Sequence, residues 1–134
     1  MTVLADTSVW VDYLRRGPSG AAADLDRLLH AGEIVLCGPV VAELLAGAGP
    51  AHRGDLWQLF SSLPWAEFGR AQWRRVGEAA AALRERGESV ALTDVEIAVA
   101  ATDAGAALWS RDADFVRIAG VLDDLDRFVP AGGN

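Results

Sequence analysis

Short apolar runs alternate with longer segments of helical spacing, and this alternation most constrains how the chain folds. Residues 3–5, 34–36 and 106–109 are apolar and too short for helices, as expected of buried strands. Parallel strands need a crossover between them, and the intervening helical segments supply it. The pattern therefore predicts an α/β fold with a central, mostly parallel sheet flanked by helices on both faces.

The helical segments show apolar residues three or four positions apart, with glycine or proline near their ends. We expect helices at residues 9–14, 21–29, 38–46, 56–63, 71–86, 92–104 and 114–118, and an edge strand at 127–129. In the segment 71–86, a stripe of Trp73, Val76, Ala80 and Leu83 predicts a face buried in the core or in a dimer. No linker or repeat divides the chain, so residues 1–134 are expected to form a single domain.

Composition excludes several classes of protein. About half of the residues (51%) are hydrophobic, which argues against disorder, yet no apolar run approaches the length of a membrane span. The N-terminus lacks the pattern of a signal peptide, so we expect a cytoplasmic protein without membrane contact. Cys37 is the only cysteine and is expected in the core, whereas His30 and His52 are expected at the surface.

The charged residues narrow the chemistry further. The net charge of −7 argues against a general nucleic-acid coat protein, although a nuclease that concentrates carboxylates around a metal can be acidic. All 12 basic residues are arginine. The lack of lysine excludes a P-loop and Schiff-base chemistry.

Four carboxylates are placed where a ligand would bind. Asp6 and Asp112 follow the first and last expected core strands, and Glu43 and Asp94 lie on helices that follow turns. Ligands of open α/β sheets bind outside the carboxyl ends of the strands. Such carboxylates would repel one another without a cation, and Mg²⁺ or Mn²⁺ prefers oxygen ligands of this kind. An empty cluster should therefore contain at least one carboxyl group with a raised pKa.

Each of these residues also has a purely structural interpretation. Asp6 could cap the first helix, although Thr7 and Ser8 also offer capping oxygens. Glu43 could face solvent, although the small residues at positions 46 and 47 leave an open face beside it.

The late carboxylates have structural alternatives too. Thr93 and Glu96 have the spacing of a capping box, which would leave Asp94 a role in the helix dipole. Asp112 and Asp114 could be turn residues. We expect Asp112 to face the site and Asp114 to cap the short helix that follows.

Taken in order, residues 5–8, 41–44, 92–98 and 110–115 resemble the acidic motifs of PIN domains, and their spacing is similar to that of VapC-type toxins. The resemblance covers essentially the whole chain. It implies metal ligation by Asp6, Glu43, Asp94 and Asp112. It also implies that a hydroxyl group of Thr7 or Ser8 orders the site, and it leaves Asp114 as the alternative fourth carboxylate.

The resemblance implies an endoribonuclease toxin that depends on Mg²⁺ or Mn²⁺ and hydrolyses RNA with metal-activated water. It further implies a cognate VapB-type antitoxin and a homodimer. Arg15, Arg16 and Arg111 are candidates for contacts with RNA phosphates.

Two other classes of function stay open. A haloacid-dehalogenase-type phosphohydrolase would need an aspartate at the position of Ser8 and a catalytic lysine, and the chain has neither. A non-catalytic, partner-binding PIN-like domain would not need all four carboxylates.

Overall fold

The computed structural model describes residues 1–20 and 22–131. Ala21, where the second helix is expected to begin, lies outside the described residues. Within them, the elements follow one another as β1 (Val3–Ala5), α1 (Thr7–Arg16), α2 (Ala22–His30), α3 (Gly38–Gly47), α4 (Pro50–Ser61), α5 (Arg70–Glu85), α6 (Leu92–Asp103), β2 (Ala107–Trp109) and α7 (Asp114–Ala119).

The sheet consists of β1 and β2, which pair in parallel although about a hundred residues separate them. Val3 lies opposite Ala107, and Ala5 lies opposite Trp109. All six residues of the two strands are buried, which explains why both runs are wholly apolar. The prediction of an α/β fold with a parallel sheet is confirmed.

Two of the expected strands are reduced to single bridges. In the segment 34–36, Ile34 bridges to Val3 and Leu36 bridges to Trp65, so its two ends pair with different neighbours. The chain then enters α3 at Gly38, which leaves no room for a longer ladder. The expected edge strand at 127–129 likewise forms only a bridge between Arg127 and Leu108.

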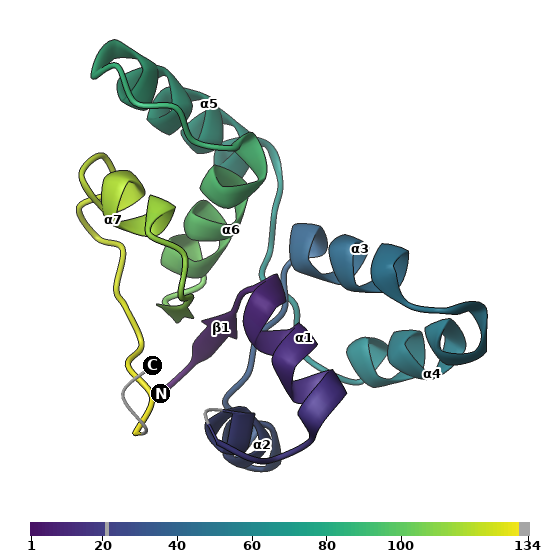
Figure 1. Cartoon of the computed structure of the whole chain (residues 1–134). Helices are drawn as coiled ribbons and strands as arrows, with labels where there is room; N and C mark the ends of the chain where they lie inside the picture. Colours follow the sequence, from purple (N-terminus) through teal and green to yellow (C-terminus); the bar gives the residue numbers. More distant parts are fainter. Residues whose placement is uncertain (21, 132–134) are drawn as a thin grey trace.

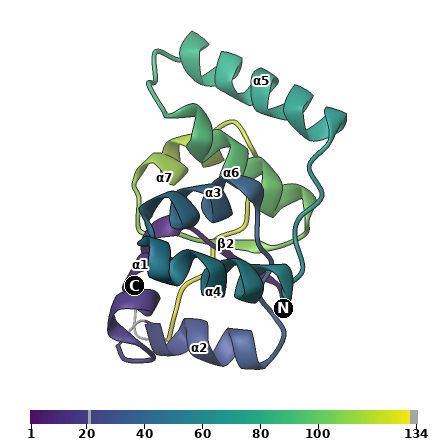
Figure 2. The ribbon, with the colours of Figure 1, turned by 90° about the vertical axis from the view of Figure 1, so that its right-hand side faces the viewer.

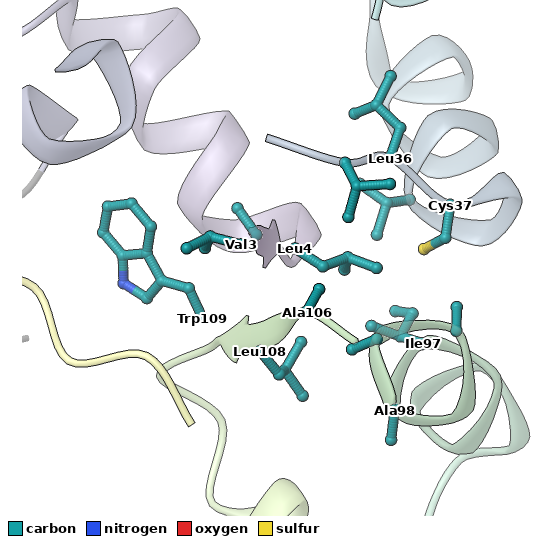
Figure 3. Packing of buried hydrophobic residues seen from close by; sticks show 14 of the residues in the cluster. Val3, Leu4, Leu36, Cys37, Ile97, Ala98, Ala106, Leu108 and Trp109 are labelled. Carbon is teal, nitrogen blue, oxygen red and sulfur yellow. The ribbon is translucent and has the colours of Figure 1, made fainter. Parts of the chain in front are cut away.

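Helices cover the small sheet from two sides. Figures 1 and 2 show α5, α6 and α7 on one side of the strands and α1 and α2 on the other. The close view in Figure 3 shows Leu4 directed toward Leu36 and Ile97, while Trp109 lies on the opposite side of the strands. Both faces of the sheet therefore contribute to one hydrophobic core.

The stripe on α5 is buried only in part. Val76 and Leu83 are 3% and 2% exposed, as expected for core residues. Trp73 is 53% exposed and packs edge-on against Phe68, with 4.8 Å between the ring centroids. The stripe is thus buried at Val76 and Leu83 and exposed at its N-terminal end, and the expected homodimer stays a prediction.

The expectations for cysteine and histidine are confirmed: Cys37 is buried, and His30 and His52 are exposed. Burial, reinforced by the charges of Glu43 and Glu96, raises the pKa of Cys37 to about 12, whereas a backbone hydrogen bond involving Val40 opposes this rise. Among the described residues, no helix has the length and apolar character needed to cross a membrane.

Candidate active site

A pocket of about 420 Å³ opens at the carboxyl ends of β1 and β2, where the sheet topology predicts a ligand site. Its walls bring together all four predicted carboxylates and both predicted hydroxyl residues. The lining residues are Asp6, Thr7, Ser8, Glu43, Asp94, Ile97, Arg111 and Asp112.

Asp6 both caps α1 and lines the pocket. Its Oδ1 accepts hydrogen bonds from the Val9 amide at 3.3 Å and from the Ser8 hydroxyl at 2.8 Å. Its Oδ2 accepts one from the Ser110 hydroxyl at 2.5 Å. The capping interpretation is therefore correct for Asp6, and it does not compete with a role in the pocket. Asp6 is only 7% exposed, and its carboxylate is held in one orientation from both sides.

Glu43 reaches the pocket from α3, and Thr7 holds it there. The Thr7 hydroxyl donates to Glu43 Oε1 at 2.6 Å, which joins the first turn of α1 to α3. Glu43 is exposed, yet its carboxylate lines the pocket. The hydroxyls of Thr7 and Ser8 thus orient two different carboxylates.

Asp94 lies in the first turn of α6, but the expected capping box is wrong. The helix begins at Leu92 with Ala91 as its N-cap, so Thr93 is already inside the helix. Burial is the largest cause that raises the pKa of Asp94 to about 6, and the nearby carboxylates reinforce it in the order Asp112, Asp114, Glu43 and Asp6. The expectation of a raised pKa in the acidic cluster is confirmed.

Asp112 and Asp114 both approach Asp94. One carboxylate oxygen from each of these three residues lies within 4.8 Å of the other two. Asp112 lines the pocket, and its Oδ1 accepts a hydrogen bond from the Asp114 amide at 2.9 Å. The carboxylate of Asp114 instead pairs with Arg117.

The expectation that Asp114 caps α7 is therefore wrong. The helix begins at Asp114 itself, and its N-cap, Ala113, has no capping side chain. The side chain of Asp112 instead accepts a hydrogen bond from the Asp114 amide at this turn, because a carboxylate two residues before an amide can reach it. Phe115, the next residue of the helix, is buried in the core.

The donor set suits a divalent cation. Carboxylate oxygens of Asp94, Asp112 and Asp114 converge, and Asp6 and Glu43 line the same pocket. Burial, reinforced by repulsion among these groups, raises the pKa of Asp94, and a bound cation would favour its charged form. Oxygen ligands of this kind match Mg²⁺ and Mn²⁺.

Ser110 is a contributor that the motif contained but the sequence did not assign. Its hydroxyl is buried, donates to Asp6 and accepts from the Asp112 amide at 3.0 Å. One side chain thus contacts the carboxylate of Asp6 and the backbone of Asp112. Its position between β2 and Asp112 is the signal that could have identified it.

The three arginines expected near the site lie in different places. Arg111 lines the pocket, whereas Arg15 lines a groove between α1, α3 and α4. Arg16 pairs with Asp12 one helical turn away.

Comparison with known proteins agrees with this geometry. A sequence model described as the PIN domain matches residues 3–121. The chain is 37% identical over 126 residues to VapC ribonuclease Mb1587 of Mycobacterium bovis, covering 90% of this chain and 94% of that protein. Ribonuclease VapC11 of Mycobacterium tuberculosis matches with the same identity and coverage.

Solved structures share the fold. The crystal structure of VapBC2 from Rickettsia felis, bound to a DNA fragment from its promoter, superposes with a TM-score of 0.75 at 22% identity, covering 96% of this chain and 98% of that one. The crystal structure of FitAcB from Neisseria gonorrhoeae gives 0.71 at 21% identity, covering 96% and 98%. By its sequence match over almost the whole chain and by its fold, this protein belongs to the PIN-domain family, among its VapC members.

Proposed function

We propose that this chain is a cytoplasmic, divalent-metal-dependent endoribonuclease and the toxin of a toxin–antitoxin pair, with residues 1–134 acting as one PIN-like domain. The observation that carries the proposal is the pocket in which Asp6, Glu43, Asp94 and Asp112 converge at the ends of the paired strands. The relatives named VapC ribonuclease support RNA as the substrate.

In the proposed mechanism, Asp6, Glu43, Asp94 and Asp112 would hold the cation. When bound, such an ion lowers the pKa of water and neutralises charge that develops on a phosphate. The contribution of the surrounding side chains is to orient the carboxylates. Ser110 and Thr7 fix the carboxylates of Asp6 and Glu43 before substrate arrives.

Histidine chemistry is not favoured by this site. Both histidines are exposed, and neither is among the residues that line the pocket. The only cysteine is buried, and its raised pKa keeps it a thiol at neutral pH. Water is therefore the nucleophile that the site favours.

The direct test is cleavage of single-stranded RNA with and without Mg²⁺ or Mn²⁺. We expect cleavage by the parent with metal and none after chelation. Asp94→Asn should abolish cleavage while keeping the fold, because the amide keeps the shape of the side chain but not its charge. Glu78→Gln is the matched control, since Glu78 pairs with Arg74 on the exposed face of α5. A parent that folds and binds an antitoxin but cleaves no RNA would favour the non-catalytic alternative.

A cognate antitoxin is the proposed partner, in line with the VapBC composition of the matching structure. We propose that it occupies the groove between α1, α3 and α4. This groove measures about 630 Å³, and its apolar lining includes Val11, Leu44, Leu56 and Leu59. Glu43 lines both the groove and the pocket, so a basic side chain of the partner could pair with it.

Such a partner would compete with the metal for Glu43. Its affinity should then fall as Mg²⁺ or Mn²⁺ is raised at fixed ionic strength. An affinity that is indifferent to the metal would place the inhibitory contact elsewhere.

A further inference from the structure

Arg111 is the cation on the wall of the carboxylate pocket, as far as the described residues show. It directly precedes Asp112 and follows Ser110, so both of its neighbours in sequence belong to the site. A guanidinium in this position has two possible roles. It could neutralise the carboxylates and block the metal, or it could contact the phosphate of a substrate.

The geometry separates these roles, because Arg111 is held by a residue outside the pocket. Its Nη2 donates to Asp12 Oδ2 at 3.2 Å. Asp12 lies on α1, 99 positions away in sequence, and it does not line the pocket. The other oxygen of Asp12 pairs with Arg16 Nε at 3.0 Å, one turn further along the helix.

The pair is also suited to bind a further anion. The Asp12 side chain is 21% exposed and that of Arg111 is 38% exposed, so the carboxylate is the more covered partner and the guanidinium the more open one. A guanidinium has five N–H donors, and Asp12 engages it through Nη2 alone. Further donors on the planar group can therefore contact a phosphate.

We propose that Asp12 is a positioning residue that holds the Arg111 guanidinium on the pocket wall for an RNA phosphate and away from the site carboxylates. This inference rests on the proposed function, since it assumes that RNA enters the pocket. Arg111 contacts the substrate, and Asp12 acts only through Arg111. Arg16 shares the carboxylate of Asp12, but its side chain is 74% exposed and lies outside the pocket.

The proposal predicts that removing the negative charge of Asp12 weakens RNA binding, which is the opposite of the general electrostatic effect. Removing a carboxylate from a protein of net charge −7 should by itself strengthen RNA binding. Glu78→Gln removes one negative charge and one ion pair on α5, so it reports this general effect. Asp12→Asn removes the same charge, yet it should weaken binding because Arg111 loses its anchor.

The experiment measures binding of a mixed-sequence single-stranded RNA by fluorescence anisotropy, with Ca²⁺ replacing Mg²⁺ to slow cleavage, and cleavage kinetics with Mg²⁺. We expect Asp12→Asn and Arg111→Gln each to weaken RNA binding roughly three- to tenfold and to raise KM more than they lower kcat. Each should reduce the slope of log affinity against log salt by about 0.7, the loss of one phosphate contact on a single strand. The double variant should bind no more weakly than Arg111→Gln alone.

Three results would overturn the inference. The first is tighter RNA binding by Asp12→Asn, as with Glu78→Gln. The second is additive losses of RNA binding in the double variant. The third is a loss of RNA binding in Arg16→Gln as large as that expected of Asp12→Asn, which would assign the phosphate contact to Arg16. Metal-dependent RNA cleavage by the parent protein distinguishes failure of this inference from failure of the proposed function. A parent that does not cleave RNA with metal contradicts the function, whereas a cleaving parent with an Asp12→Asn variant like Glu78→Gln contradicts only the role of Asp12.

Discussion

The hydroxyl of Ser110 donates to Oδ2 of Asp6 at 2.5 Å and so joins the residues that follow the two paired strands. The same hydroxyl accepts from the amide of Asp112. The backbone pairing continues to this point, since the Asp6 amide donates to the Trp109 carbonyl at 3.0 Å. The sheet therefore ends directly in the site.

Ser110→Ala is expected to reduce RNA cleavage by roughly 10–100-fold, because Asp6 and Asp112 both lose a partner that orients them. Ser110→Thr keeps the hydroxyl and should retain most activity. Initial rates at saturating Mg²⁺ check this prediction. Equal activity of the alanine and threonine variants would contradict it.

Asp6→Ala should destabilise the protein by about 1 kcal/mol, since the amide of Val9 loses its capping acceptor. Asp6→Asn keeps an oxygen in the same place and should unfold near the parent's midpoint. Both variants should lose cleavage. Urea denaturation followed by circular dichroism measures the difference. A strongly destabilised Asp6→Asn would mean that the carboxylate serves the fold rather than the site.

Asp94 should make the metal-free protein less stable as the pH rises. Its pKa in the folded state is about 6, above the ordinary value of 3.8, so the folded state binds more protons between these values. Stability that is fully present below about pH 4 is therefore lost as the pH rises through about 6.

Asp94→Asn should remove this loss of stability at high pH. At pH 7 without metal, the variant should be more stable than the parent by about 1–2 kcal/mol, a value reduced for solvent screening. The difference should vanish near pH 4. Denaturation at both pH values in the presence of a chelator tests this prediction. A variant less stable than the parent at pH 7 would show that burial and repulsion of the charged carboxylate do not destabilise the folded protein.

Asp112→Asn is expected to abolish cleavage, whereas Asp114→Asn should stay within about tenfold of the parent. Both carboxylates lie near Asp94, but Asp112 lines the pocket while Asp114 is paired with Arg117. Parallel measurement of metal-dependent rates for the two variants decides between them. The reverse order of losses would make Asp114 the fourth site carboxylate.

Cys37 should resist alkylation by iodoacetamide in the native protein at pH 8. Its thiol is buried and its pKa is about 12, so almost no thiolate exists to react. Modification should become rapid in denaturant, which mass spectrometry can follow over time. Rapid modification under native conditions would indicate that α3 opens locally.

The parts of the fold that follow from local pattern are predictable from the sequence. The runs at β1 and β2 are buried on both faces, and the helices between them carry their own periodicity and glycine stops. Asp6 and Asp112 follow core strands, and Asp94 lies in the first turn of α6. Glu43 instead lies in the middle of α3 and is assigned with the other three by the resemblance to PIN-domain motifs. In the folded protein, all four carboxylates lie around the pocket at the carboxyl end of the sheet.

The rest depends on tertiary contacts or on shifts of one or two residues. The capping box at Thr93 fails because α6 begins two residues earlier than that motif requires, with Ala91 rather than Thr93 as its N-cap. Trp73 is exposed because the core covers Val76 and Leu83 of the α5 stripe but not its N-terminal end. The pairing of Asp12 with Arg111 joins residues 99 positions apart, and no local pattern reveals it.

The pairing of β1 with β2 also determines when during synthesis the pocket can form. Asp6 is made well before the strand that pairs with β1, which begins at Ala107, and Asp112 follows later still. Chains emerge from the ribosome N-terminus first, and contacts between distant segments form only after both exist. A product that stops before Ala107 lacks the partner of β1 and one of the carboxylates. The carboxylate pocket can therefore form only after Asp112 has been made, and translation products that stop earlier do not contain it.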